Sequence, residues 1–172
     1  MLTQNFINAI AMVLQRGSID KGLLPITAYN GTTYYLSSSA AIPANLTQTL
    51  TLSVSAAGIC MGQGDTAPAL TDYQLERQIE YSLTGNVLQT VLDLDANGNP
   101  YIQFDIAVTN TADTAVTVRE IGYRQNLRGS AAVGGTGSNR VCLLDRTVLD
   151  TPVTIEPGGA ATIRYTLKTV IV

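Results

Sequence analysis

The chain has 172 residues, of which only 13% are charged, against about 25% in an average soluble domain. Its net charge is −3 and its only lysines are Lys21 and Lys168, so no basic stripe is available for direct contact with a nucleic acid. Histidine is absent, which excludes Ser-His-Asp and Cys-His catalysis and imidazole metal sites. The low charge predicts that other subunits cover much of the surface; the alternative is a neutral surface rich in Ser and Thr.

The length fits one domain whose core needs neither disulfides nor metals. Cys60 and Cys142 lie far apart among apolar residues, so we expect two buried free thiols, with a disulfide between neighbouring strands as the alternative. No stretch reaches the roughly 18 apolar residues of a membrane-spanning helix, and the pattern of a signal peptide is missing. We therefore expect a protein made in the cytoplasm, without membrane insertion.

The N-terminal 45 residues differ in pattern from the rest. Residues 1–17 have the apolar spacing of a helix, with Thr3 as the expected N-cap, and this helix can pack on its own sheet or on a neighbouring subunit. Residues 18–45 contain a hairpin signal at Asn30-Gly31 and a linker of small residues. We expect a helix and extended arm over residues 1–45 and a β-domain over residues 46–172. The interface candidates on the arm are Phe6, Ile10, Val13, Leu14, Tyr34 and Tyr35.

Strand patterns fill the β-domain. Apolar and polar residues alternate over five stretches, namely 47–61, 87–94, 101–108, 116–123 and 162–171. The apolar parity changes between Val118 and Ile121, which predicts a β-bulge near Arg119 or Glu120. Seven or more strands without alternating helices predict an all-β fold, an antiparallel two-layer β-sandwich that is jelly-roll-like and carries one N-terminal helix.

The end of the chain predicts how the sandwich closes. Residues 151–155 and the strand that begins at Thr162 flank a turn at Glu156-Pro-Gly-Gly159, and we expect them to pair across it. Residues 129–140 are rich in Gly and Ser and predict an exposed loop. The expected sandwich core consists of Ile102, Phe104, Ile106, Ile163, Tyr165 and Leu167.

Few residues carry a pattern for chemistry. Asp93, Asp95 and Asn97 are spaced like the first ligands of a calcium loop, but Phe104 occupies the twelfth position, where a bidentate Glu is required. A hairpin turn at Asn97-Gly98 is the better interpretation, and a weak calcium site is the alternative. The glycine-rich stretches lack the residues of dinucleotide and phosphate loops. We expect neither a cofactor nor an enzymatic activity.

Two motifs, Gly62-x-Gly64-x-Thr66-x-Pro68 and Asp72-Tyr-x-Leu75, are followed downstream by residues 116–123 and 143–155 and by the closing strand. Together these segments resemble structural proteins of tailed bacteriophages, over about residues 50–172. The resemblance implies a non-enzymatic β-sandwich component of the virion in a tail, neck, fibre or capsid-surface position. Such a component would assemble with identical subunits and dock on other virion proteins.

A host-surface binding module on the phage particle is the alternative function. Its contact residues would be Arg128, Asn139 and Arg140 in the exposed loop, which would bind a glycan or a protein. The chain has no Trp and this loop has no Tyr, so the aromatic residues that usually stack on sugars are scarce.

Overall fold

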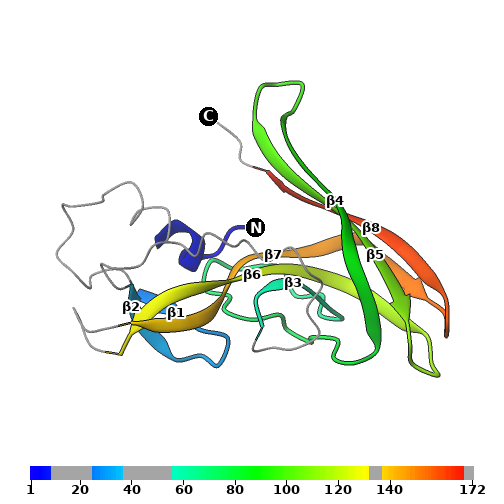
Figure 1. Cartoon of the computed structure of the whole chain (residues 1–172), viewed down its shortest axis with the longest axis horizontal. Helices are drawn as coiled ribbons and strands as arrows, with labels where there is room; N and C mark the ends of the chain where they lie inside the picture. The colour runs from blue at the N-terminus through cyan, green and yellow to red at the C-terminus, as the bar shows by residue number, and fades with distance from the viewer. Residues whose placement is uncertain (9–24, 37–55, 132–136, 169–172) are drawn as a thin grey trace.

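The computed structural model describes residues 1–8, 25–36, 56–131 and 137–168, which form two antiparallel sheets and one short helix over residues 4–8 (Figure 1). This arrangement confirms the predicted all-β fold with two layers, while the jelly-roll connections stay a prediction. The large sheet contains β1 (Pro25–Thr27), β2 (Thr33–Leu36), β3 (Gly58–Gly62), β6 (Val116–Ser130) and β7 (Ser138–Ile155). The small sheet contains β4 (Leu83–Leu94), β5 (Pro100–Asn110) and β8 (Ala160–Lys168).

Strand β6 is the centre of the large sheet. It pairs with β7 on one side, and with β2 and β3 on the other, while β1 extends the sheet beyond β2. The register of β6 against β7 shifts between Val118 and Glu120, which confirms the predicted bulge. Both faces of β6 are buried over residues 120–125, which follow this shift.

The core lies between the two sheets and matches the predicted set. Phe104, Ile106, Ile163 and Tyr165 are buried, and the half-buried Ile102 and Leu167 pack against them. From the large sheet, Tyr123 meets Phe104 with ring centroids 5.9 Å apart, within the favourable range for an aromatic pair. Full burial of one such side chain contributes roughly 1.5–3 kcal/mol, so the contact between the sheets is a main source of stability.

The expected pairing of residues 151–155 with the closing strand is wrong. Residues 151–155 belong to β7, and residues 153–155 pair with β6, while β8 pairs with β5 in the other sheet. The turn at residues 156–159 therefore crosses from one layer to the other. Asn110, buried at the end of β5, holds this crossing: its side-chain nitrogen donates to Ile155 O at 2.9 Å, and its backbone N–H donates to Gly159 O at 2.9 Å.

Residues 25–36 of the expected arm form strands of the large sheet, while the division at residue 45 stays a prediction. Residues 25–36 form the predicted hairpin around Asn30-Gly31, and β2 pairs with β6. Thr3 precedes the helix as predicted, but its hydroxyl donates to Leu143 O at 2.7 Å instead of accepting from the helix. Residues 9–24, 37–55 and 169–172 lie outside the described residues. Predictions for the later part of the helix, the linker and the beginning of the strand at 47–61 therefore stay untested.

Candidate functional site

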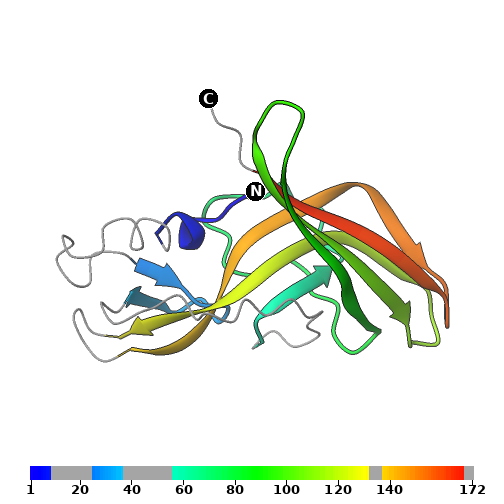
Figure 2. The same cartoon turned by 45° about the horizontal axis from the view of Figure 1, so that its top comes forward.

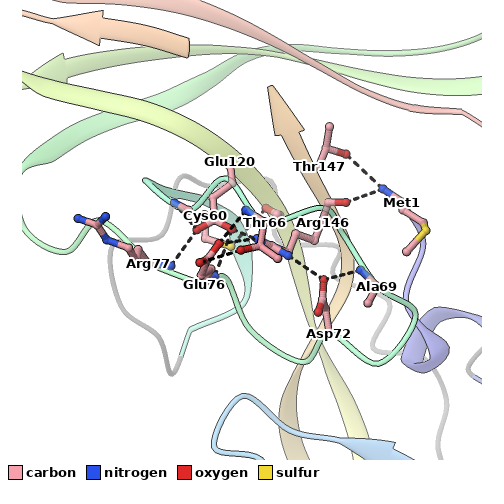
Figure 3. Close-up of polar contacts among 12 residues, drawn as sticks. Met1, Cys60, Thr66, Ala69, Asp72, Glu76, Arg77, Glu120, Arg146 and Thr147 are labelled. Atoms are coloured by element: carbon pink, nitrogen blue, oxygen red, sulfur yellow. Dashed lines mark hydrogen bonds and ion pairs between the residues drawn. The ribbon is translucent and has the colours of Figure 1, made fainter. Parts of the chain in front are cut away.

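The connection between β3 and β4 folds back over the outer face of the large sheet (Figure 2). Its return is fixed by backbone hydrogen bonds from Gln63 N to Arg77 O at 2.8 Å and from Ile79 N to Met61 O at 2.9 Å. Leu75 is buried there against Cys60 and Leu143, which face away from the main core. The connection is therefore an ordered layer on the sheet, held by polar groups that Figure 3 shows.

Glu120 is the acceptor at the centre of these groups and is 0% exposed. Its Oε1 accepts the backbone N–H groups of Gly64 at 3.0 Å and Arg77 at 2.9 Å. Its Oε2 accepts the Glu76 N–H at 3.2 Å and Arg146 Nε at 2.7 Å. A buried carboxylate is stable only when its charge and lone pairs are satisfied, and here backbone donors and a cation do this together.

Arg146 is the cation of this site and is buried on β7. Besides Glu120, its guanidinium pairs with Asp72 at 2.9 Å and with Glu76 at 3.4 Å. Burial by itself lowers the pKa of Arg146, but the hydrogen bonds to Glu120 and Asp72 outweigh it and raise the pKa above the ordinary value. The side chain therefore stays charged and joins the loop to two strands of the sheet.

Thr66 completes the set from within the loop. Its backbone N–H and its hydroxyl donate to the two oxygens of the Glu76 carboxylate at 3.0 and 2.9 Å, and these bonds lower the pKa of Glu76. We call Thr66, Asp72, Glu76, Glu120 and Arg146 the Glu120–Arg146 network.

Two glycines make room for this network. A Cβ atom at Gly62 would lie 2.3 Å from Glu120 Oε1, and a Cβ atom at Gly64 would lie 2.5 Å from Glu76 Cβ. Both distances are shorter than atoms tolerate, so a side chain at either position would displace a carboxylate of the network. The glycine spacing of the motif at residues 62–68 therefore has a steric cause.

The network brings together four of the five segments on which the expected resemblance to phage structural proteins rests, and the closing strand is not part of it. The motif at residues 62–68 supplies Thr66, and the motif at residues 72–75 supplies Asp72, with Glu76 directly after it. The two downstream segments supply Glu120 and Arg146. Sequence reasoning missed the last two residues as a site. The sequence shows each of them as a charged residue beside apolar residues of a strand, which is a weak signal because it does not show that a loop covers the charge.

The polar groups of the network bond to other groups of the same chain. Glu120 and Arg146 are buried and bonded to other groups of the chain, so they have no face for a substrate. A catalytic carboxylate must reach the proton that it transfers, within about 3.2 Å or through one water. The geometry therefore supports a structural role, namely holding residues 63–78 on the large sheet.

A second buried polar group lies near the same strands. Arg124 Nε donates to Cys60 Sγ at 3.2 Å, and Arg124 also bonds the Gln78 side chain. Cys60 and Cys142 are both free and buried, as predicted. Burial raises the pKa of both thiols, that of Cys142 to about 12, which keeps them protonated and unreactive.

The calcium candidates lie in the turn between β4 and β5. Asp95 Oδ1 accepts the N–H groups of Asn97 at 2.8 Å and Asn99 at 2.9 Å, and Asp95 pairs with Lys168. Lys168 first, then these hydrogen bonds, hold the pKa of Asp95 well below its usual range. Asp93 Oδ1 accepts the N–H of Leu94 instead. These contacts form the predicted hairpin turn, and a calcium ion would have to displace Lys168.

The interface candidates on the arm are only partly described. Phe6 and Tyr34 are half-buried and pack against the core of their own chain, and the half-buried Tyr35 pairs with β1 and β6. Ile10, Val13 and Leu14 lie outside the described residues. The described end of the helix thus packs on its own sheet.

The loop expected at residues 129–140 is shorter than predicted. The ladder between β6 and β7 runs on to Gly129 opposite Ser138, so pairing with the neighbouring strand outweighs the low strand propensity of glycine there. Arg128, Asn139 and Arg140 therefore lie on strands. Arg128 Nε donates to the backbone oxygen of residue 137 at 3.0 Å, Arg140 stacks over the Tyr34 ring at 4.1 Å, and Asn139 is exposed.

Neither a family model, a curated protein nor a solved structure matches this chain. Within residues 1–8, 25–36, 56–131 and 137–168, no helix is long and apolar enough to cross a membrane. The same residues contain no group of three or more His, Cys, Asp or Glu side chains placed to hold a metal ion. The candidate site is therefore the Glu120–Arg146 network, in which Glu120 and Arg146 are buried and Thr66, Asp72 and Glu76 are partly or fully exposed.

Proposed function

We propose that this protein is a non-enzymatic structural component of a tailed-bacteriophage virion, which assembles with identical subunits and docks on other tail, neck or capsid proteins. The observation that carries the proposal is the meeting of four of the five phage-like segments in one network, whose centre, Glu120 and Arg146, is buried. Segments that depend on one another in this way form one structural unit within this chain, which is what a shared structural role of these segments would require.

The use of charge in the chain supports the same role. Only 13% of the residues are charged, and the network takes up four charged residues in fixing a loop on a sheet. A weakly charged surface on a rigid support is suited to contacts with other subunits, whose buried centres are depleted of charged residues. A rigid subunit also loses little conformational entropy when it enters an assembly.

Purified particles provide the test. The host that carries the encoding genome is induced to release phage, and the particles are separated on a density gradient and washed in high salt. We expect the protein in the particle band at a fixed ratio to the major capsid protein, and gold-labelled antibody would show its position. Recovery of the protein only in the soluble fraction would refute the proposal.

The host-surface alternative has less support from the geometry. Two of its three contact residues, Arg128 and Arg140, are engaged with residue 137 and Tyr34 of the same chain, which leaves Asn139 exposed. Binding of the isolated protein to a glycan array, lost on changing Asn139 to alanine, would favour this alternative.

A further inference from the structure

Residues 1–3 extend the large sheet beyond β7. Leu2 lies opposite Asp145 in an antiparallel bridge, and the backbone N–H of Thr3 donates to Leu144 O at 2.9 Å. These residues therefore meet the edge of β7 in the way that an added strand does, with main-chain bonds as the contact.

The short helix that follows fastens to two further parts of the fold. Gln4 N donates to Leu70 O at 2.8 Å, in the loop between β3 and β4. The Asn5 side chain bonds the N–H and the C=O of Thr27 on β1 at 2.7 and 2.8 Å. Phe6 adds a half-buried apolar contact with the core. Hydrogen bonds of backbone and amide groups thus hold one short segment on three separate elements.

The end of this segment lies against the start of β1. Asn8 Nδ2 donates to Pro25 O at 2.6 Å, so the two ends of the stretch 9–24 are in contact. A short turn is enough to join ends that lie this close. The stretch has 16 residues, and a chain of that length spans at most about 55 Å when it is extended. The connection is therefore long enough for residues 1–8 to reach a second molecule.

We propose that residues 1–8 of one copy lie on β7, β1 and the β3–β4 loop of a second copy, so that assembly exchanges this segment between identical subunits. The proposal deepens the proposed function, from which it takes the identical partner, and it names the contact. Every bond described above forms equally well between two copies, because both carry the same donors and acceptors. Exchange therefore keeps these contacts and makes them intermolecular.

The direction of exchange sets the symmetry of the assembly. Reciprocal exchange between two copies closes a dimer, whereas exchange in one direction closes a ring of more subunits. In both forms the edge of β7 is covered by the neighbour, which keeps it from pairing with unrelated strands. The apolar spacing of residues 1–17 allows packing on a neighbouring subunit, and exchange specifies the surface that receives it.

A thiol cross-link distinguishes exchange from packing within one molecule. Gln4 and Leu70 are both exposed and joined by a backbone bond, so Gln4→Cys with Leu70→Cys in one chain should leave the fold intact, as circular dichroism would verify. A short bismaleimide then bridges the two thiols without requiring disulfide geometry. Exchange predicts covalent dimers or larger oligomers on a denaturing gel. The buried Cys60 and Cys142 should not react, as the treated wild type would show.

Thr117→Cys with Thr154→Cys is the matched control. The two threonine hydroxyls lie 2.9 Å apart on the paired strands β6 and β7, so this variant should give linked monomers. Linked monomers from the Gln4–Leu70 variant would overturn the proposal. A failure of that variant to link would overturn it as well, because residues 1–8 would then not lie on this surface. Equal yields of dimers from both variants would indicate random collision, with the same consequence.

Mixed single variants give an independent reading. Chains with Gln4→Cys and chains with Leu70→Cys are unfolded together in urea, refolded and treated with the same reagent. Exchange predicts a covalent heterodimer that neither variant forms alone, and its absence would overturn the proposal. Presence in virions is decided separately by the particle experiment, so either proposal can fail while the other stands.

Discussion

Replacing Arg146 by methionine removes the cation of the Glu120–Arg146 network and keeps an unbranched side chain in its place. Glu120 then remains buried without its 2.7 Å partner. Loss of one member of a buried ion pair typically costs roughly 3–5 kcal/mol, because the other charge is left uncompensated. Glu120 keeps three backbone donors, so we expect a loss of about 3 kcal/mol, at the lower end of that range.

The measurement is unfolding by urea and by heat. For a chain of this size about 3 kcal/mol corresponds to a fall in Tm of roughly 6–12 °C. Limited trypsin digestion reports on the loop at residues 63–78 separately from global unfolding, since Arg77 lies in this loop and its N–H donates to Glu120. Cleavage after Arg77 should become faster in the variant, because the loop is freed before the sandwich unfolds.

Arg164→Met is the matched control. It makes the same chemical change in the pair with Asp105, where the arginine side chain is 66% exposed, so we expect a much smaller loss of stability than for Arg146→Met. Glu120→Gln and the double variant with Arg146→Met complete a mutant cycle, in which we expect the double variant to lose less than the sum of the two single losses. Equal losses for Arg146→Met and Arg164→Met, or strict additivity in the cycle, would refute the reasoning.

Three further predictions concern packing, pH and metal. Gly64→Ala should lower the free energy of unfolding by about 1–3 kcal/mol, because the Cβ atom of the alanine would overlap Glu76. It should also speed tryptic cleavage within residues 63–78. An unchanged urea midpoint would contradict this prediction. Hydrogen bonds from Thr66 lower the pKa of Glu76, so this stabilisation is complete above the ordinary pKa of 4.5 and is lost as the pH falls through the lowered value. Burial, and then the neighbouring Asp145 carboxylate, raise the pKa of Tyr165, and burial raises the pKa of Cys142 to about 12. The stability of the fold should therefore decline as the pH rises above the ordinary pKa values of these groups, 10 and 9. A urea midpoint that is flat from pH 3 to 11 would contradict both the loss of stability in acid and the loss in alkali. Chelation of divalent ions should leave Tm unchanged if the turn after β4 is a plain hairpin turn, and a clear fall would restore the calcium interpretation.

The parts of the fold that sequence could predict depend on local signals. Alternation gave the inner face of β5 and β8, Asn97-Gly98 gave the turn between β4 and β5, and a change of parity gave the bulge at Glu120. The partner of β8 could not be predicted in this way. The residues at 156–159 indicate that the chain turns, but the buried side chain of Asn110 determines that it crosses to the other sheet.

The Glu120–Arg146 network could not be predicted because its members are distant in sequence. Glu120 and Arg146 lie on β6 and β7, and Asp72 belongs to a loop, so only the folded chain brings the three together. A sequence shows that a strand contains a charge, but it does not show whether a loop returns to cover it. The interface candidates had the opposite problem, since Phe6 and Tyr34 have apolar surfaces that the chain itself buries.

The mass of the wild-type protein in solution tests assembly with identical subunits most directly. Native mass spectrometry and light scattering over a range of concentrations would determine it. Assembly with identical subunits predicts a discrete oligomer of this chain. A monomer at every concentration would contradict self-assembly of this chain.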